Sequence, residues 1–340
     1  MHMADALVSP AVAGTMYAVS AAAAGYSIYK VRRESDSSKI PVMGVMGAFV
    51  FAAQMINFTI PGTGSSGHLC GGMLLSALLG PYAGFLSMIG VLLIQCLMFA
   101  DGGLLALGCN VWNMAFYGCF IGSMLIWKNI MRNGASRKKI TAASITGCIV
   151  TLQLGAFSVT LETLASGITS LSFISFVSVM QPIHLAIGLV EGIITACVLC
   201  FVYEARPDIL WGVGGDTVSA RGRLTFKKTL VVLSVSALVI AGVVSLFASS
   251  HPDGLEWSIE RLTGSTEIEA EGGVYDTAEK LQDTTAVLPD YSFKNSDSPA
   301  GTSVSGVAGG VAVIAVCVAA CYVFRFFRHS GQSGLKGEKK

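Results

Sequence analysis

Charged residues are scarce in this sequence, and that scarcity excludes an ordinary soluble domain. Asp, Glu, Lys and Arg make up 13% of the 340 residues, whereas 53% are apolar. A typical soluble domain carries about 25% charged residues. The mean hydropathy is +0.65, and the apolar residues come in blocks of about 17 to 25, the length that spans a bilayer. The sequence therefore predicts an all-α integral membrane protein.

Motifs of common enzymes are also missing. There is no Gly-x-x-x-x-Gly-Lys-Ser/Thr phosphate loop, so the chain is not expected to power ATP-driven transport alone. There is no Ser-His-Asp arrangement, no His-Glu-x-x-His and no dinucleotide fingerprint. We expect no enzymatic activity and no catalytic residues. We expect membrane lipid as its surroundings and no nucleic-acid partner.

A disulfide framework and a cleavable signal peptide are two further absences. Eight of the nine cysteines lie within or at the end of an apolar segment, which favours small buried residues over disulfides. The first apolar run has no basic leader, and its Lys and Arg residues follow it instead. That order argues against a cleaved secretory signal.

Nine apolar segments are long enough, or nearly so, to cross a membrane. They cover roughly residues 11–29, 42–58, 69–80, 82–99, 111–127, 140–166, 176–203, 230–247 and 307–327. The third is short and ends at Gly80-Pro81, so it either forms a broken segment with the fourth or re-enters the membrane. The prediction is a seven-helix body followed by two further transmembrane helices.

The basic residues predict the orientation of these spans. With nine spans, 19 of the 22 Lys and Arg residues fall on one face, at positions 30–39, 128–139, 206–228 and 325–340. Lys and Arg are retained on the cytoplasmic side. We therefore expect a multi-pass protein of the cell inner or plasma membrane, with an extracytoplasmic N-terminus and a cytoplasmic C-terminus.

Composition shifts divide the chain into two modules. Residues 1–204 form the seven-span body, residues 205–228 a cytoplasmic linker rich in Gly, Asp and Arg, and residues 229–340 a module with two spans. Those two spans flank an extracytoplasmic loop, 248–306, with eleven acidic and three basic residues. The loop is rich in Ser, Thr and Gly, which predicts partial disorder. It either concentrates cations near the membrane or is an ordinary solvated loop.

Two of the five histidines have positions that suit metal binding. His2 is the second residue, and His68 ends the Gly-rich loop that begins at Pro61. The predicted topology puts both on the outer face. The amine of Met1, the amide nitrogen of His2 and the Nδ1 atom of His2 can chelate one ion in a plane, leaving the fourth position to His68. Tetragonal nitrogen sites select Cu(II) or Ni(II), and binding weakens as pH falls because the ligands must lose protons.

Other readings of these residues stay open. A histidine at position two and a histidine in a loop also occur without any metal site. Asp5 is near enough in sequence to orient an imidazole. Glu162, His184 and Glu191 lie at membrane depth, where ionisable residues are functional candidates. They either form a proton or ion relay or fix helix packing, and the second reading is favoured.

Several motifs closely resemble the CbiM/NikM family, the substrate-binding components of energy-coupling-factor (ECF) cobalt and nickel transporters. The residues that carry this resemblance are Met1-His-Met-Ala-Asp-Ala-Leu, Gly67-His-Leu-Cys-Gly-Gly with Leu79-Gly-Pro, Gln95 with Phe99-Ala-Asp-Gly-Gly, and His184-Leu-Ala-Ile-Gly-Leu-Val-Glu191. Pro252-Asp-Gly-Leu-Glu-Trp257 resembles the two-span CbiN/NikN component. Together the motifs cover nearly the whole chain, as in a NikM–NikN fusion.

The resemblance implies a seven-helix body with the N-terminal segment inserted from outside. It implies Met1, His2 and His68 as ligands of the transported ion, Ni²⁺ first and Co²⁺ second. It implies three partners, a CbiQ/NikQ-like transmembrane coupling component and two cytoplasmic CbiO/NikO-like ATPase subunits. The alternatives are an autonomous secondary transporter that uses Glu162, His184 and Glu191, and a receptor or scaffold that does not transport.

Overall fold

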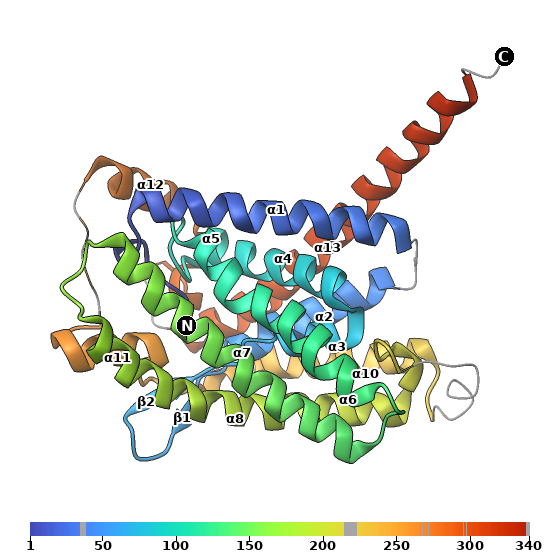
Figure 1. The fold of residues 1–340 in the computed structure, drawn as a ribbon, viewed down its shortest axis with the longest axis horizontal. Coiled ribbons are helices and arrows are strands. Elements are labelled where there is room, and N and C mark those ends of the chain that lie inside the picture. Colours follow the sequence, from blue (N-terminus) through green and yellow to red (C-terminus); the bar gives the residue numbers. More distant parts are fainter. Residues whose placement is uncertain are drawn as a thin grey trace.

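The computed structural model describes residues 1–34, 39–213, 223–266, 268, 270, 272–294, 296 and 298–337, with side chains as far as residue 320. Most of this chain is helical, which confirms the predicted class (Figure 1). Residues 214–222 of the expected linker and the acidic residues at 267, 269, 271 and 297 lie outside the described part. So do the side chains of the basic tail.

Six described helices are long and apolar enough to cross a membrane. They are α1 (Pro10–Glu34), α4 (Pro81–Phe99), the continuous helix Leu107–Met131, α7 (Arg137–Ser166), α8 (Phe173–Ala205) and the described part of α13 (Pro299–Gly337) up to Ala320. The Leu107–Met131 helix consists of α5 (Leu107–Asn110), the π-helical η2 (Val111–Trp127) and α6 (Lys128–Met131). A shorter apolar helix, α2 (Lys39–Gln54), accompanies them, and the 17-residue α10 (Phe226–Gly242) follows the linker. The nine-span count stays a prediction.

The short third segment forms α3 (Gly72–Leu79), which has eight residues. At a rise of 1.5 Å per residue it is about 12 Å long, well short of the roughly 30 Å hydrocarbon core. It therefore does not cross as a helix of its own. Its N-terminal end follows the loop that carries His68.

One small sheet departs from the all-α prediction. Strands β1 (Phe58–Ile60) and β2 (Ser65–Gly67) pair antiparallel, with Phe58 opposite Gly67 and Ile60 opposite Ser65. This segment is Gly- and Ser-rich and carries no apolar block, so hydropathy does not reveal it. The hairpin leads directly from β2 to His68.

Helices α7 and α8 form a closely packed antiparallel pair in the body. Gly188 and Gly192, four residues apart on α8, face the main chain of α7. A Cβ on them would lie 3.0 Å from the Cα atom of Ile149 and 2.6 Å from that of Ile145. Small residues at this spacing allow helices in a membrane to approach closely. The contact fixes the face of α8 on which His184 and Glu191 lie.

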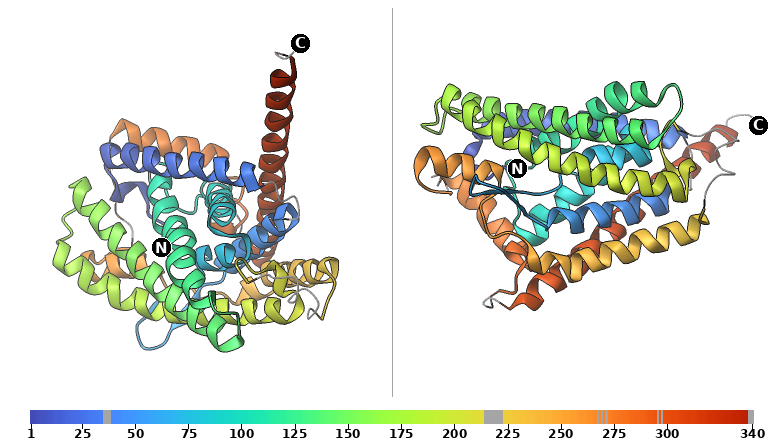
Figure 2. Two further views of the ribbon diagram at one scale, coloured as in Figure 1. Left: turned by 45° about the vertical axis from the view of Figure 1, so that its right-hand side comes forward. Right: turned by 90° about the horizontal axis from the view of Figure 1, so that it is seen from below.

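The C-terminal module packs against the body instead of standing apart. After α10 come η4 (Val244–Phe247), α11 (Gly254–Thr263), α12 (Gly273–Thr285), η5 (Pro289–Tyr291) and α13. Helices α10 and α13 both lie along α2, and α13 continues away from the bundle at its C-terminal end (Figure 2). The hairpin, α11 and α12 gather at one end of the bundle.

The 248–306 loop, predicted to be partly disordered, contains the two helices α11 and α12. Helix α11 begins with a full capping box, in which Asp253 and Glu256 each bind the other's main chain. Leu255 and Ile259, one helical turn apart, are buried. The loop is polar on average, so its composition did not reveal the two apolar residues one helical turn apart. Their spacing gives α11 an apolar face that packs against the body.

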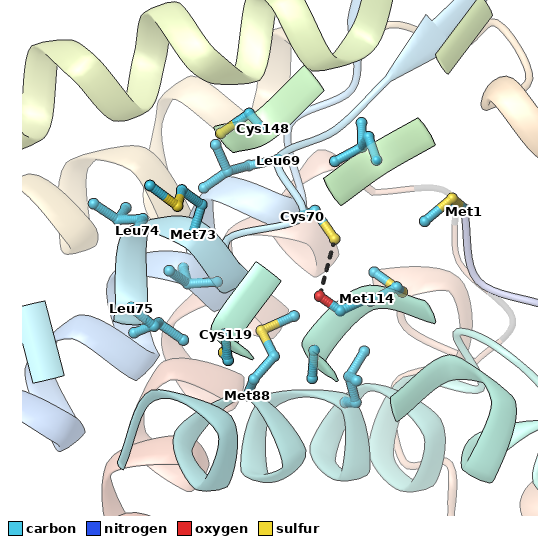
Figure 3. Packing of buried hydrophobic residues seen from close by; sticks show 14 of the residues in the cluster. Met1, Leu69, Cys70, Met73, Leu74, Leu75, Met88, Met114, Cys119 and Cys148 are labelled. Carbon is cyan, nitrogen blue, oxygen red and sulfur yellow. Dashed lines mark hydrogen bonds between the residues drawn. The ribbon is translucent and has the colours of Figure 1, made fainter. Parts of the chain in front are cut away.

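The main core is a continuous apolar cluster that reaches the first residue of the chain. Met1, Met3, Leu7 and Val8 belong to it together with residues of α3, α4 and α8. Figure 3 shows Met1 near Cys70 and Met114, where the thiol of Cys70 donates to the Met114 carbonyl. The N-terminal segment is therefore part of the folded interior.

Candidate metal centre

The N-terminal segment is held inside the body by main-chain hydrogen bonds. The Met3 amide donates to Asn110 Oδ1 at 2.7 Å, and Asn110 Nδ2 donates back to the Met3 carbonyl at 3.2 Å. The Gly103 amide donates to the same carbonyl at 2.9 Å. These contacts orient residues 1 and 2 toward the interior, where only 6% of Met1 is exposed.

His68 is positioned by the hairpin before it and by α8 behind it. Gly71, three residues later, has φ 85°, a left-handed conformation that favours glycine. A Cβ there would lie 2.3 Å from Val50 Cγ1. In this conformation the Gly71 amide donates to Glu191 Oε1 at 3.0 Å. Glu191 thus holds the loop that presents His68.

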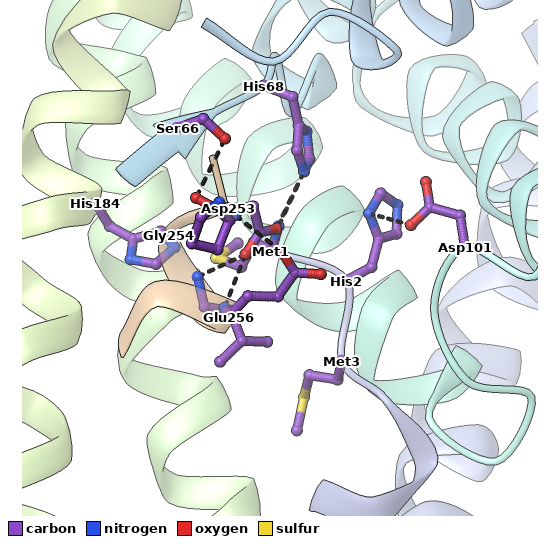
Figure 4. A network of polar contacts seen from close by, with 12 residues as sticks. Met1, His2, Met3, Ser66, His68, Asp101, His184, Asp253, Gly254 and Glu256 are labelled. Atoms are coloured by element: carbon purple, nitrogen blue, oxygen red, sulfur yellow. Dashed lines mark hydrogen bonds and ion pairs between the residues drawn. The ribbon is translucent and has the colours of Figure 1, made fainter. Parts of the chain in front are cut away.

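The terminal amine of Met1 and the imidazole of His68 meet in the interior. Met1 N lies 2.9 Å from His68 Nε2 (Figure 4). Two nitrogen ligands about 2.0 Å from one ion, at a right angle to each other, lie about 2.8 Å apart. In this structure the two atoms form a hydrogen bond, and their separation is also that of neighbouring ligands on one metal ion.

His2 lies beside this pair, but its ring nitrogens face two other side chains. The His2 and His68 rings are stacked with centroids 5.2 Å apart and planes inclined by 25°. His2 Nδ1 lies 3.1 Å from Asp101 Oδ1, and His2 Nε2 lies 3.2 Å from Gln95 Oε1. For Nδ1 to join the amine and His68 around one ion, the ring has to turn away from Asp101.

Burial lowers the pKa of His2 to about 4, although the Asp101 carboxylate opposes that change. The imidazole is therefore neutral at physiological pH, which is the form that binds metals.

The expectation that Asp5 orients an imidazole is wrong. Asp5 Oδ1 accepts a hydrogen bond from the Ala106 amide at 3.0 Å, and the carboxylate at His2 is that of Asp101. Asp5 starts a 3₁₀ turn, Asp5–Leu7, that directs its side chain to the loop before α5. Asp5 is close to His2 in the sequence, but the turn directs its side chain away from the His2 ring.

A small cavity of about 10 Å³ adjoins the pair of nitrogens. Its lining consists of Met1, Gly67, His68, Cys70, Leu152, His184, Ile187, Asp253 and Gly254. A volume of this order holds a single water molecule. Among the described residues, no group of three or more His, Cys, Asp and Glu side chains forms a metal cluster, so a site here depends on the terminal amine.

Asp253 reaches the same point from the C-terminal module, and the sequence did not reveal it as a site residue. Its Oδ2 atom forms an ion pair with the terminal amine and lies 3.6 Å from His68 Nε2. Burial acts to raise the pKa of this carboxyl, but the positive amine and His68 outweigh burial and hold that pKa well below its ordinary value. The Pro252-Asp-Gly-Leu-Glu motif marked the segment, but not its contact 252 residues away in sequence.

The intramembrane ionisable residues are buried in separate places. Glu162 accepts from Asn113 Nδ2 at 2.7 Å, and Glu191 holds Gly71. His184 Nδ1 lies 2.8 Å from the Met180 carbonyl, while its Nε2 atom has no hydrogen-bond partner among the described residues. Of the three, His184 is the one that lines the cavity.

Comparison with protein families accounts for both modules. Residues 2–209 match the family model described as the cobalt uptake substrate-specific transmembrane region, CbiM. This chain belongs to the CbiM family. Residues 227–326 match the PDGLE domain, the motif at Pro252–Glu256. The resemblance seen in the sequence is thereby confirmed, and the CbiM assignment makes the chain a multi-pass membrane protein of a metal transport family.

Similar proteins include fused chains of the same two-part organisation. The chain is 38% identical, over 93% of its length and 96% of the relative's, to a putative fused nickel transport protein NikMN of Archaeoglobus fulgidus. It is 28% identical to a cobalt transport protein CbiM of Geobacter sulfurreducens, over 72% of this chain and 71% of that one. A crystal structure of a truncated transition metal transporter matches with TM-score 0.53 and 29% identity, over 59% of this chain and 98% of that one. These relatives are transport proteins and not enzymes.

Proposed function

We propose that this protein captures Ni²⁺, and Co²⁺ as second choice, through Met1, His2 and His68. The ligands are the terminal amine, the amide nitrogen and Nδ1 of His2, and Nε2 of His68. The observation that carries the proposal is the 2.9 Å separation of the amine and His68 Nε2, with the His2 ring stacked beside them. Four nitrogens in a plane favour Ni²⁺ over ions that prefer oxygen. The fused relatives that are named for nickel support the same ion.

The capture takes place on the extracytoplasmic side, and delivery is inward. The protein acts as the substrate-specific component of an ATP-driven ECF importer, with a transmembrane coupling protein and two cytoplasmic ATPases as partners. Residues 1–204 bind the ion, 205–228 link the modules, and 229–340 form the NikN-like module. The absence of a phosphate loop from the sequence is the reason that ATPase partners are needed.

The test adds two residues ahead of Met1. Two added residues turn the Met1 amine into an amide and move the histidine to position four, where the terminal amine and the imidazole no longer close fused chelate rings on one ion, so we expect Ni²⁺ binding to the purified protein to be lost. The same two residues added at the C-terminus are the control. Undiminished Ni²⁺ binding by the N-terminally extended protein contradicts the proposed ligand set. Metal analysis of the unmodified protein decides between nickel and cobalt.

A second candidate is autonomous secondary transport. The unpartnered Nε2 atom of buried His184 on the cavity wall favours it, with Glu191 further along α8 and Glu162 as further relay groups. Uptake into proteoliposomes without the ATPases, abolished by Glu191→Gln, supports this candidate. Uptake that requires the ATPases and ATP supports the importer.

A further inference from the structure

The two carboxylate oxygens of Asp253 have different partners. Oδ1 accepts from the Leu255 amide at 2.7 Å and the Glu256 amide at 3.0 Å, which caps α11. Oδ2 points the other way, to the terminal amine and His68. The cap therefore holds one oxygen in place while the second is directed at the proposed ligands.

The peptide that carries Asp253 is bound to the hairpin that carries His68. The Ser66 amide donates to the Pro252 carbonyl at 2.8 Å, and the Ser66 hydroxyl donates to the His251 carbonyl at 2.8 Å. Further from the site, Trp257 Nε1 donates to the Thr63 carbonyl at 3.0 Å. His68 and Asp253 are thus positioned by the same unit, although they belong to different modules.

A divalent ion at this position brings two positive charges into a buried pocket. A buried charge is unfavourable unless an opposite charge accompanies it. Among the residues that line the cavity, Asp253 is the one with a carboxylate. The deprotonated His2 amide offsets one of these two charges. The other nitrogen ligands are neutral and include no acidic side chain, so one positive charge remains to be balanced.

We propose that Asp253 is the counter-charge of the bound ion, so that the C-terminal module completes the metal site begun by Met1, His2 and His68. The inference rests on the proposed function and adds a residue to it. It makes the PDGLE segment part of the binding site, in addition to any role in assembly. Without an ion, the same carboxylate pairs with the terminal amine. The negative charge is therefore already in the pocket when an ion binds.

The test is Asp253→Asn in the full-length protein, with Ni²⁺ as the only added ligand. Asparagine is as good an N-cap as aspartate, so the cap of α11 is retained while the charge is lost. Loss of a group that supports the ligands from outside costs about 10- to 100-fold in metal affinity. We expect a weakening of that size in the dissociation constant for Ni²⁺.

Glu256→Gln is the matched control. It removes a carboxylate three residues away, whose Oε2 atom accepts from the Asp253 amide at 3.0 Å, and glutamine preserves the capping box. We expect its Ni²⁺ affinity to stay close to that of the wild type. Asp253→Ser, which also keeps a cap but shortens the side chain, is expected to weaken binding as Asp253→Asn does. Thermal unfolding of each purified variant checks the fold.

Each outcome has a separate meaning. If the wild type binds neither Ni²⁺ nor Co²⁺, the proposed function fails. If the wild type binds and folded Asp253→Asn binds equally well or more tightly, the counter-charge is wrong while the function stands. Equal weakening by Asp253→Asn and Glu256→Gln also overturns it, because the effect is then one of total charge and not of this position.

Discussion

The His2 imidazole is uncharged at neutral pH because burial lowers its pKa to about 4. Protons therefore compete with the metal at His2 only near that pH or below it. The amine of Met1 and the amide of His2 must also lose protons to bind. We expect Ni²⁺ affinity to fall as the pH is lowered from 8 to 6, with about two protons released per ion.

Calorimetry in buffers of different ionisation enthalpy measures this release. A Ni²⁺ affinity independent of pH across this range is the result that contradicts the chelate.

A substitution at Gly103 tests whether the N-terminal segment is inserted into the body. A Cβ at this position would lie 2.4 Å from the Asp5 main-chain nitrogen, which cannot move without moving the segment. Gly103→Ala should therefore displace residues 1–5 and lower Ni²⁺ affinity by about 10-fold or more.

Gly14→Ala serves as the control for Gly103→Ala, since a Cβ on Gly14 meets nothing within 4 Å. An unchanged dissociation constant for Gly103→Ala speaks against the placement of the segment.

At the scale of elements, η5 of the C-terminal module reaches the other side of the site. The Tyr291 hydroxyl donates to Asp101 Oδ2 at 2.5 Å, and its ring stacks on Phe99 with centroids 4.8 Å apart. Burial and the Asp101 charge raise the pKa of Tyr291 well above its ordinary value, so the hydroxyl remains a donor. Because Asp101 faces His2, Tyr291 acts on His2 through this carboxylate.

His2 Nδ1 has to leave Asp101 to reach the ion, and Tyr291 holds Asp101 in that contact. Tyr291→Phe should therefore strengthen Ni²⁺ binding, by up to roughly 10-fold, while preserving the stacked ring. Tyr275→Phe is the control, since its hydroxyl donates to the Val8 carbonyl and touches no proposed ligand. Equilibrium competition with a chelator measures both. Equal Ni²⁺ affinity of Tyr291→Phe and the wild type contradicts an effect of Tyr291 on His2.

Long helices were predictable and short elements were not. The spans α4, α7 and α8 follow from apolar blocks, because a helix that crosses a bilayer needs about 20 apolar residues. The hairpin 58–67 and helices α11 and α12 have no such composition, and their stability comes from contacts with the body. The hairpin and α11 are the short elements that carry His68 and Asp253 to the site.

Across the whole molecule, charge separates the two ends of the bundle. Basic residues cluster beyond the ends of α1, α6 and α8, opposite the end that holds the hairpin, α11 and α12. We expect Asp276→Cys on α12 to react with an impermeant maleimide in intact cells, and Lys138→Cys to react only after permeabilisation. The parent protein gives the background from native cysteines. The reverse labelling pattern contradicts the orientation.

The amino-acid sequence by itself determined the membrane class and the family, and it predicted the approximate spans and the three proposed ligand residues, Met1, His2 and His68. Those features follow from composition, from residue type and from motifs that are local in the chain. Only the tertiary structure decided that Asp253 contacts the amine and His68, that Asp101 contacts His2, and that Glu191 holds Gly71 in the loop of His68. These carboxylates come from three distant segments, and packing of the helices, not spacing in the sequence, brings each of them to its partner.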